Sequence, residues 1–246
     1  MKQYRADLHL HTLLSPCGSL EMSPSAIIRG AAAKQLDMIA ITDHNHTGHC
    51  RLVRQLAGEW NIYVLYGAEV TTREEVHCLT LFDTDEQISA FQAYLDDYLP
   101  HLANHPEYFG DQVIIGEKEE ILCELPYLLT NGIDQSIEEV EARVHELGGL
   151  FIPAHVDRPA NGLYSQLGIF PGGLLTDAVE ISRYSGREMI CDLHPELAGR
   201  TLIQDSDAHH PSDIGRAFTL FEFERPAFEE VKGALRGLGG RRAYLP

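Results

Sequence analysis

The segment Asp7-Leu8-His9-Leu10-His11-Thr12 decides how the rest of the chain is interpreted. Residues 4–8 can form a short buried strand. Because side chains two positions apart in a strand point to the same face, His9 and His11 are expected to project together. Two neighbouring imidazoles at the end of a strand, with Asp7 as an outer acceptor, form a corner suited to a divalent metal.

Four more segments carry His, Asp or Glu at the point where an apolar run ends: Ile39–His44, Val64–Glu69, Leu150–His155 and Leu202–His209. In α/β folds the carboxyl ends of the strands meet on one side of the sheet, where active sites lie. The sequence therefore predicts one polar site built from many strand ends, and not a set of surface histidines.

Length and composition limit the class of protein. The 246 residues contain no Pro/Gly/Ser-rich linker or charge block, which predicts one domain over residues 1–246. Nineteen Lys and Arg face 37 Asp and Glu, a net charge of −18, which argues against strong nucleic-acid binding. A small phosphorylated substrate remains compatible, because bound cations reverse the local potential.

Cysteine usage and hydropathy bear on location. The five cysteines are odd in number, scattered and free of a CxxC motif, which favours a reducing cytoplasm over a disulfide framework. No apolar run approaches the roughly 18 residues that a membrane span needs. The expected protein is soluble and cytoplasmic, without a membrane partner, and its oligomeric state cannot be read from the sequence.

The order of elements predicts a barrel. About seven strand–helix units follow one another, which favours an irregular (βα)7 TIM-like barrel over an open three-layer sheet. A capping box of Ser136 and Glu139 opens a helix that runs to Glu146. The long loop after His155, through residue 173, is a candidate lid, and residues 100–130 are the least periodic part of the chain.

The ordered set of motifs resembles that of the PHP (polymerase and histidinol phosphatase) superfamily: Asp7–His11, Thr42–His44, Gly67–Glu69, His77, Pro153–His155 and Ser206–His209. Segments 15–18, 109–112 and 155–159 further resemble a free-standing bacterial branch described as metal-dependent phosphoesterases. The resemblance implies an irregular barrel that holds two or three divalent metals.

Carried onto this chain, the resemblance assigns the ligands of each metal. The first metal takes His9, His11, Glu69 and Asp207; the second shares Glu69 and adds His77 and His155; the third uses His44 and His209 with a residue of the first loop. Relatives usually have Asp or His at that last position. Here the position falls at Pro16 or Cys17, of which only Cys17 can ligate, so the identity or occupancy of the third metal stays open.

The expected chemistry is hydrolysis of a small phosphate ester. Paired metals lower the pKa of a bridging water and neutralise the phosphoryl oxygens, with Glu69 and Asp207 as the carboxylates that hold them. Arg158 and Arg183, each just beyond a strand end, are expected to bind phosphate in a bidentate fork. Mixed nitrogen and oxygen ligation suits Zn, Mn or Fe, and a thiolate from Cys17 favours Zn or Fe.

Three alternatives are weighed against this reading. A histidinol-phosphatase-specific enzyme differs only in substrate, and a non-catalytic PHP module would need no intact ligand set. An amidohydrolase is disfavoured because none of the four lysines, Lys2, Lys34, Lys118 and Lys232, lies at the carboxyl end of a strand.

The role of Glu180 stays open between supporting a ligand and pointing outward to solvent. The remaining histidines have no assigned role, although His46 and His210 lie near enough to act as a leaving-group acid.

Overall fold

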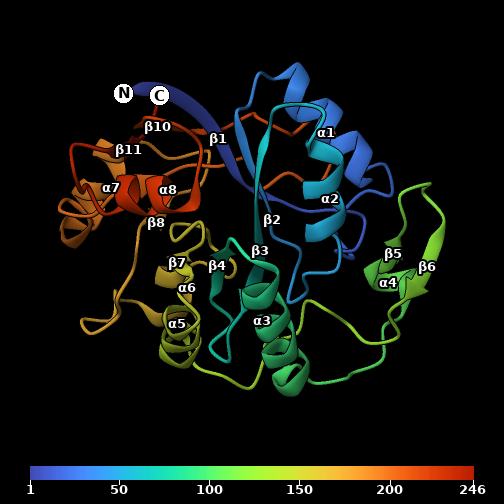
Figure 1. Cartoon of the computed structure of the whole chain (residues 1–246). Helices are drawn as coiled ribbons and strands as arrows, with labels where there is room; N and C mark the ends of the chain where they lie inside the picture. Colours follow the sequence, from blue (N-terminus) through green and yellow to red (C-terminus); the bar gives the residue numbers. More distant parts are fainter.

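A curved sheet of seven strands forms the centre of the computed structural model, which describes residues 1–246 (Figure 1). Its strand order is β11-β10-β1-β2-β3-β4-β7. The strands are β1 (Lys2–Leu10), β2 (Met38–Ile41), β3 (Tyr63–Thr71), β4 (His77–Phe82), β7 (Leu150–Pro153), β10 (Thr219–Phe223) and β11 (Arg242–Tyr244). Strands β1, β2 and β3 are parallel neighbours, whereas all other pairs in this sheet are antiparallel.

Two short strand pairs complete the β-structure: β5 (Val113–Ile115) with β6 (Ile121–Glu124), and β8 (Val179–Glu180) with β9 (Leu202–Ile203). The β8–β9 pair lies between the two edges of the curved sheet, with β8 next to β7 and β9 next to β11. The amide of Val156, just after β7, donates to the Glu180 carbonyl at 3.0 Å, and the His11 amide donates to the Ala208 carbonyl at 3.1 Å. The strand ends therefore surround a common centre.

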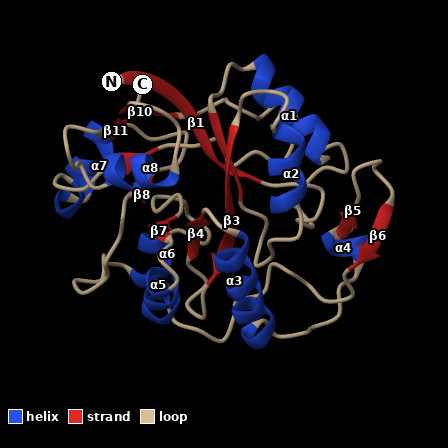
Figure 2. Ribbon diagram, viewed as in Figure 1, coloured by secondary structure: helices blue, strands red, loops and turns tan.

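The helices are α1 (Pro24–Ala33), α2 (Cys50–Ala57), α3 (Asp85–Tyr98), α4 (Pro106–Phe109), α5 (Ile137–Glu146), α6 (Leu163–Leu167), α7 (Arg187–Leu193) and α8 (Phe228–Leu235), with a 3-10 turn at Pro195–Leu197. Most of them cover the outside of the sheet, whereas α4 lies apart from it, beside β5 and β6 (Figure 2). The capping box predicted for α5 is confirmed, because the Ser136 hydroxyl accepts from the Glu139 amide and the Glu139 carboxylate accepts from the Ser136 amide.

Apolar side chains fill both faces of the sheet. All four residues of β2 and of β7 are buried, as a strand between two layers requires. On the outer face, Phe82 of β4 packs against Phe91 of α3 with ring centroids 4.8 Å apart, and both are fully buried. Burial of each such side chain stabilises the fold by roughly 1.5–3 kcal/mol, which anchors α3 behind the strands that carry the polar site.

The predicted α/β class is confirmed, but seven regular βα units are not found. Strands β3 and β4 form an antiparallel pair joined by a short turn, and no helix connects them. Strand β10 pairs antiparallel with β1, and β11 pairs antiparallel with β10, beside the N-terminus (Figure 1). The predicted lid contains the short helix α6. No helix combines the length and apolar character that crossing a membrane would need.

Candidate metal centre

Glu69 is the buried carboxylate around which the site is arranged. Its Oε1 lies 2.8 Å from His77 Nδ1 and 2.9 Å from His155 Nε2. Its Oε2 lies 3.0 Å from His44 Nδ1. Two further imidazole nitrogens, from His9 and His11, are each 3.3 Å away. Burial alone would raise the pKa of Glu69, but the surrounding histidines, His77 foremost, lower that pKa well below its usual range.

The backbone explains why Glu69 reaches this position. The Glu69 amide donates to the carbonyls at the end of β2, and the Asn45 amide donates back to the Glu69 carbonyl at 3.0 Å. Gly67 allows the close pairing of β3 and β4, since a Cβ there would lie 2.6 Å from the Thr80 carbonyl oxygen. The Gly67-Ala68-Glu69 motif thus places the carboxylate beside His44.

Asp207 supplies a second carboxylate to the same centre. Its Oδ1 lies 3.4 Å from His9 Nε2 and 3.3 Å from His11 Nε2, and these two nitrogens are 3.2 Å apart. The donor atoms of His9, His11, Glu69 and Asp207 all lie within 4.8 Å of one another. Four mixed nitrogen and oxygen donors at this spacing match the number and type that bind a divalent transition metal.

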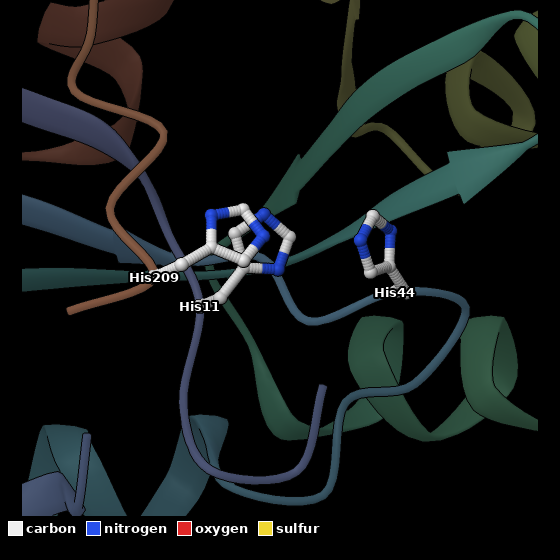
Figure 3. Close-up of side chains that lie close together, drawn as sticks. All are labelled: His11, His44 and His209. Atoms are coloured by element: carbon white, nitrogen blue, oxygen red, sulfur yellow. The ribbon is translucent and has the colours of Figure 1, made fainter. Parts of the chain in front are cut away.

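Two further groups of three donors overlap the first. One consists of His44, Glu69 and His77, and the other of His11, His44 and His209. Figure 3 shows the rings of His11 and His209 side by side, with His44 facing them. The ring centroids are 4.2 Å apart for His11 and His209 and 4.6 Å apart for His11 and His44. The three groups together form one continuous donor cluster.

Two candidate ligands stand on left-handed backbone. His155 has φ of 28° and Asp207 has φ of 50°, a region that non-glycine residues rarely adopt. Such conformations cost about 1–3 kcal/mol each and persist where the surrounding structure imposes them. Both residues follow a β-strand directly or closely, so the bend turns their side chains toward the centre.

The chemistry of the donor set fits divalent cations. His44 Nδ1 and His155 Nδ1 are buried without a hydrogen-bond partner; the former is near Glu69 but not aligned for a hydrogen bond. Burial lowers the pKa of His9 and His44, but nearby carboxylates outweigh burial and raise both values well above the usual range. Positive charge in the cluster is therefore stabilising, whether it comes from protonated imidazoles or from divalent ions that replace the imidazole protons.

A layer of outer hydrogen bonds fixes which imidazole nitrogen faces the centre. Both carboxylate oxygens of Glu180 lie 3.1 Å from His9 Nδ1, and one also accepts from the His155 amide at 2.8 Å. The Ser15 hydroxyl donates to Asp43 at 2.7 Å and lies 3.0 Å from His11 Nδ1. The Nδ1 atoms of His9 and His11 must then carry the proton, which leaves their Nε2 lone pairs for a metal.

Glu180 is thus a supporting group, which the sequence left undecided. It is 2% exposed, within β8, and its carboxylate faces two candidate ligands. An acidic residue inside an otherwise apolar strand was the signal in the sequence. Ser15 and Asp43 complete the support of His11.

The structure brings together eight of the nine predicted metal-site residues. His9, His11, His44, Glu69, His77, His155, Asp207 and His209 line the cluster described above. Cys17 belongs to none of the three donor groups. Cys17 is an exposed residue whose thiol points inward; partial burial of the thiol raises its pKa, but the nearby His44 and His209 outweigh that effect and lower the pKa to about 5. The ligand role of every member of this set stays a prediction.

The two predicted arginines lie beside the cluster. Arg158 pairs with Oδ2 of Asp207. Arg183 donates to the Ser206 carbonyl at 3.3 Å and to the Tyr184 hydroxyl at 2.9 Å. Both line a cavity of about 160 Å³ whose wall also includes Asp207 and residues 155 and 209. The cavity therefore adjoins the donor cluster and carries guanidinium groups on its wall.

Fold and donor set together define an α/β protein with a centre suited to several divalent cations. The family profile described as "PHP domain" matches residues 7–156, and a second, described as "PHP-associated", matches residues 201–237. The chain belongs to the PHP family, as the motif resemblance indicated.

Several known proteins are similar to it. The protein YqxK of Bacillus subtilis is 24% identical over 98% of this chain and 64% of its own length. The lesion-specific endonuclease Q of Pyrococcus furiosus superimposes with a TM-score of 0.78 at 22% identity, over 98% of this chain and 58% of that protein. A Bifidobacterium adolescentis protein described as a metal-dependent phosphoesterase has a TM-score of 0.53 at 20% identity, over 83% of this chain and 87% of that one. The chain thus spans less than two thirds of the first two.

One expectation about partners is wrong. A second endonuclease Q structure, with a TM-score of 0.75, holds a 27-mer duplex substrate with an abasic lesion at its active site. This finding overturns the expectation of a small phosphorylated substrate and of no strong nucleic-acid binding. The expectation rested on a net charge of −18, which sums over the whole chain and does not describe the mouth of a cavity lined by Arg158 and Arg183.

Proposed function

We propose that the chain is a metal-dependent hydrolase that cleaves phosphodiester bonds in nucleic acid. The observation that carries the proposal is the cavity of about 160 Å³, which shares His155, Arg158, Asp207 and His209 with the donor cluster or its edge. A phosphate in this cavity would contact Arg158 and Arg183 while facing the metal ligands. The DNA-bound endonuclease Q, which has the same fold, supports the choice of nucleic acid.

The residues divide the work by their chemistry. His9, His11, Glu69 and Asp207 would hold one cation, Glu69 with His77 and His155 a second, and His44 with His209 and Cys17 a third. Zn, Mn and Fe suit this donor set. When bound, such cations supply a water nucleophile at neutral pH and neutralise charge on the phosphoryl oxygens. Glu69 can contact two cations because a carboxylate has two oxygens, whereas a neutral imidazole binds one.

Arg158 and Arg183 would bind and orient the phosphate. A guanidinium presents a planar fork of donors that matches two phosphate oxygens. The Arg158 side chain is 44% exposed and already contacts a carboxylate, so an incoming phosphate can exchange for part of that contact. Tyr184, 77% exposed beside Arg183 at the cavity, offers an aromatic face on which an unpaired base could stack.

The test uses purified protein with Mn²⁺ or Zn²⁺ and end-labelled DNA duplexes, with and without an abasic site, alongside single-stranded DNA and RNA. We expect metal-dependent cleavage of at least one of these, and its loss in the double variant His9→Asn/Asp207→Asn. Cleavage that survives in the double variant would come from a contaminant. A metal-loaded protein that hydrolyses p-nitrophenyl phosphate but no nucleic acid would overturn the substrate class.

Arginine variants test the role of the cavity. Arg183→Gln should lower kcat/KM by about 100-fold, a typical loss for one donor that stabilises transition-state charge. Arg216→Gln is the matched control, because Arg216 pairs with Asp213 at 2.8 Å but does not line the cavity. Equal activity of both variants would exclude Arg183 from phosphate binding.

A further inference from the structure

Residues 102–128 form an arm that projects from the body of the protein and contains α4, β5 and β6 (Figure 1). Its base is closed by the Leu128 amide, which donates to the Leu102 carbonyl at 2.8 Å. The sequence showed this segment only as the least periodic part of the chain. The contacts that hold this arm against the rest of the protein lead, through a series of hydrogen bonds, to the candidate metal ligand His11.

The arm docks on the loop that follows β1 and the residues after it. Val113 and Ile115 of β5 form a buried cluster with Leu13 of that loop. Gly110, at φ of 103°, lies so close to the loop that a Cβ there would be 2.0 Å from the Pro16 carbonyl oxygen. At the arm's other end, Glu119 accepts from the hydroxyls of Ser23, the N-cap residue of α1, and Ser25, in the first turn of that helix.

A buried histidine joins the arm to the loop by hydrogen bonds. The Ile115 amide donates to His49 Nε2 at 3.0 Å, and His49 Nδ1 lies 2.7 Å from the Thr12 hydroxyl. Because a backbone amide can only donate, His49 Nε2 must be the acceptor. His49 Nδ1 therefore carries the ring proton and donates it in a hydrogen bond to the Thr12 hydroxyl oxygen. His49 is fully buried, and burial lowers its pKa, in agreement with a neutral ring.

The hydrogen bonds continue from Thr12 to a candidate metal ligand. The Thr12 hydroxyl donates to Asp43 Oδ2 at 2.8 Å, and the Ser15 hydroxyl donates to Asp43 Oδ1 at 2.7 Å. Ser15 in turn accepts from His11 Nδ1 at 3.0 Å. All five side chains, from His49 to His11, are fully buried. The directions of these hydrogen bonds are therefore fixed along the whole series, because each hydroxyl and ring N–H in it has one acceptor.

We propose that His49 is a positioning residue of the metal centre, which locks the first loop, and with it the donor nitrogen of His11, to the docked arm. His49 touches neither the donor cluster nor the cavity and acts only through Thr12, Asp43 and Ser15. The inference concerns metal binding and holds whether or not the chain cleaves nucleic acid.

The experiment measures metal binding. Zn²⁺ affinity is determined by competition with a chromogenic chelator, and Co²⁺ alone is titrated while its visible absorption reports the coordination geometry. His49→Leu removes both hydrogen bonds, and His49→Gln keeps a donor and an acceptor. Loss of outer partners commonly weakens metal binding 10–100-fold. We expect at least about a tenfold loss of Zn²⁺ affinity and an altered Co²⁺ spectrum in His49→Leu, with most of the affinity restored in His49→Gln.

Val53→Ala is the matched control, because Val53 is fully buried on α2, the helix that His49 immediately precedes as its N-cap residue, and takes no part in the hydrogen bonds. It should lower Tm while leaving metal affinity and the Co²⁺ spectrum unchanged. If His49→Leu does not fold, Thr12→Val against Thr12→Ser gives the same comparison one step nearer the metal. Wild-type affinity and spectrum in the variant that lacks the hydrogen bonds, or an equal loss in Val53→Ala, would overturn the proposal.

Discussion

Replacing Glu180 by Gln tests how the buried strand β8 prepares the metal centre. The Glu180 carboxylate uses one oxygen for His9 Nδ1 and the other for both His9 Nδ1 and the His155 amide. Gln has nearly the same shape but only one acceptor oxygen. If that oxygen keeps the His155 amide, the new NH₂ group faces the Nδ1–H of His9, so two donors meet in a buried place.

The magnitude follows from the loss of this support. His9 would lose the anionic partner that holds its Nε2 toward Asp207 and Glu69. A 10–100-fold loss of metal affinity is expected for such an outer partner, which corresponds to about 1.4–2.7 kcal/mol. Because the loss is in metal binding, activity at saturating metal should recover much of the way.

The assay is a chelator competition with Zn²⁺ and Mn²⁺ on wild type, Glu180→Gln and Glu141→Gln. Glu141 is the matched control, since it also forms a carboxylate–histidine pair, partly buried, with His145, but lies on α5 away from the cluster. Glu141→Gln should bind metal as the wild type does. The reasoning is refuted if Glu180→Gln binds metal with unchanged affinity, or if Glu141→Gln weakens binding to the same extent.

Three further predictions concern other parts of the chain. Cys17→Ala should bind less Co²⁺ per chain and lack a thiolate charge-transfer band in the near ultraviolet; a wild type without this band would exclude Cys17 as a ligand. A hydrogen bond to Asp177 raises the pKa of His145, so the Tm advantage of wild type over His145→Asn should be full below pH 6.5 and shrink as pH rises through the raised pKa; a pH-independent difference would contradict this. Phe91→Ala should lower the free energy of unfolding in urea by about 3–5 kcal/mol, and a loss below about 1 kcal/mol would show that the α3 contact is not core packing.

The sequence contained most of the candidate metal centre because strand ends in an α/β fold converge whatever the details of their connections. Residues such as His9, Glu69 and His155 each follow an apolar run, and their meeting required only that these runs be strands of one curved sheet. The α5 capping box was equally local, since its two hydrogen bonds involve residues three positions apart.

Other features depend on contacts between distant segments. Strand β4 runs antiparallel to its neighbour β3, and β10 runs antiparallel to its neighbour β1. The direction of a strand cannot be recognised from its apolar residues, so regular βα units were predicted in place of these pairs. Net charge gave the wrong expectation about nucleic acid because it has no spatial resolution.

The sequence by itself determined which residue types stand at the strand ends and therefore what kind of ion they can hold. Only the tertiary structure decided which nitrogen of each imidazole faces that ion. Glu180 reaches His9 across 171 positions of the chain, and Ile115 reaches His49 across 66. A hydrogen bond between such distant residues forms only after the strands and the arm have packed, so no local pattern records it.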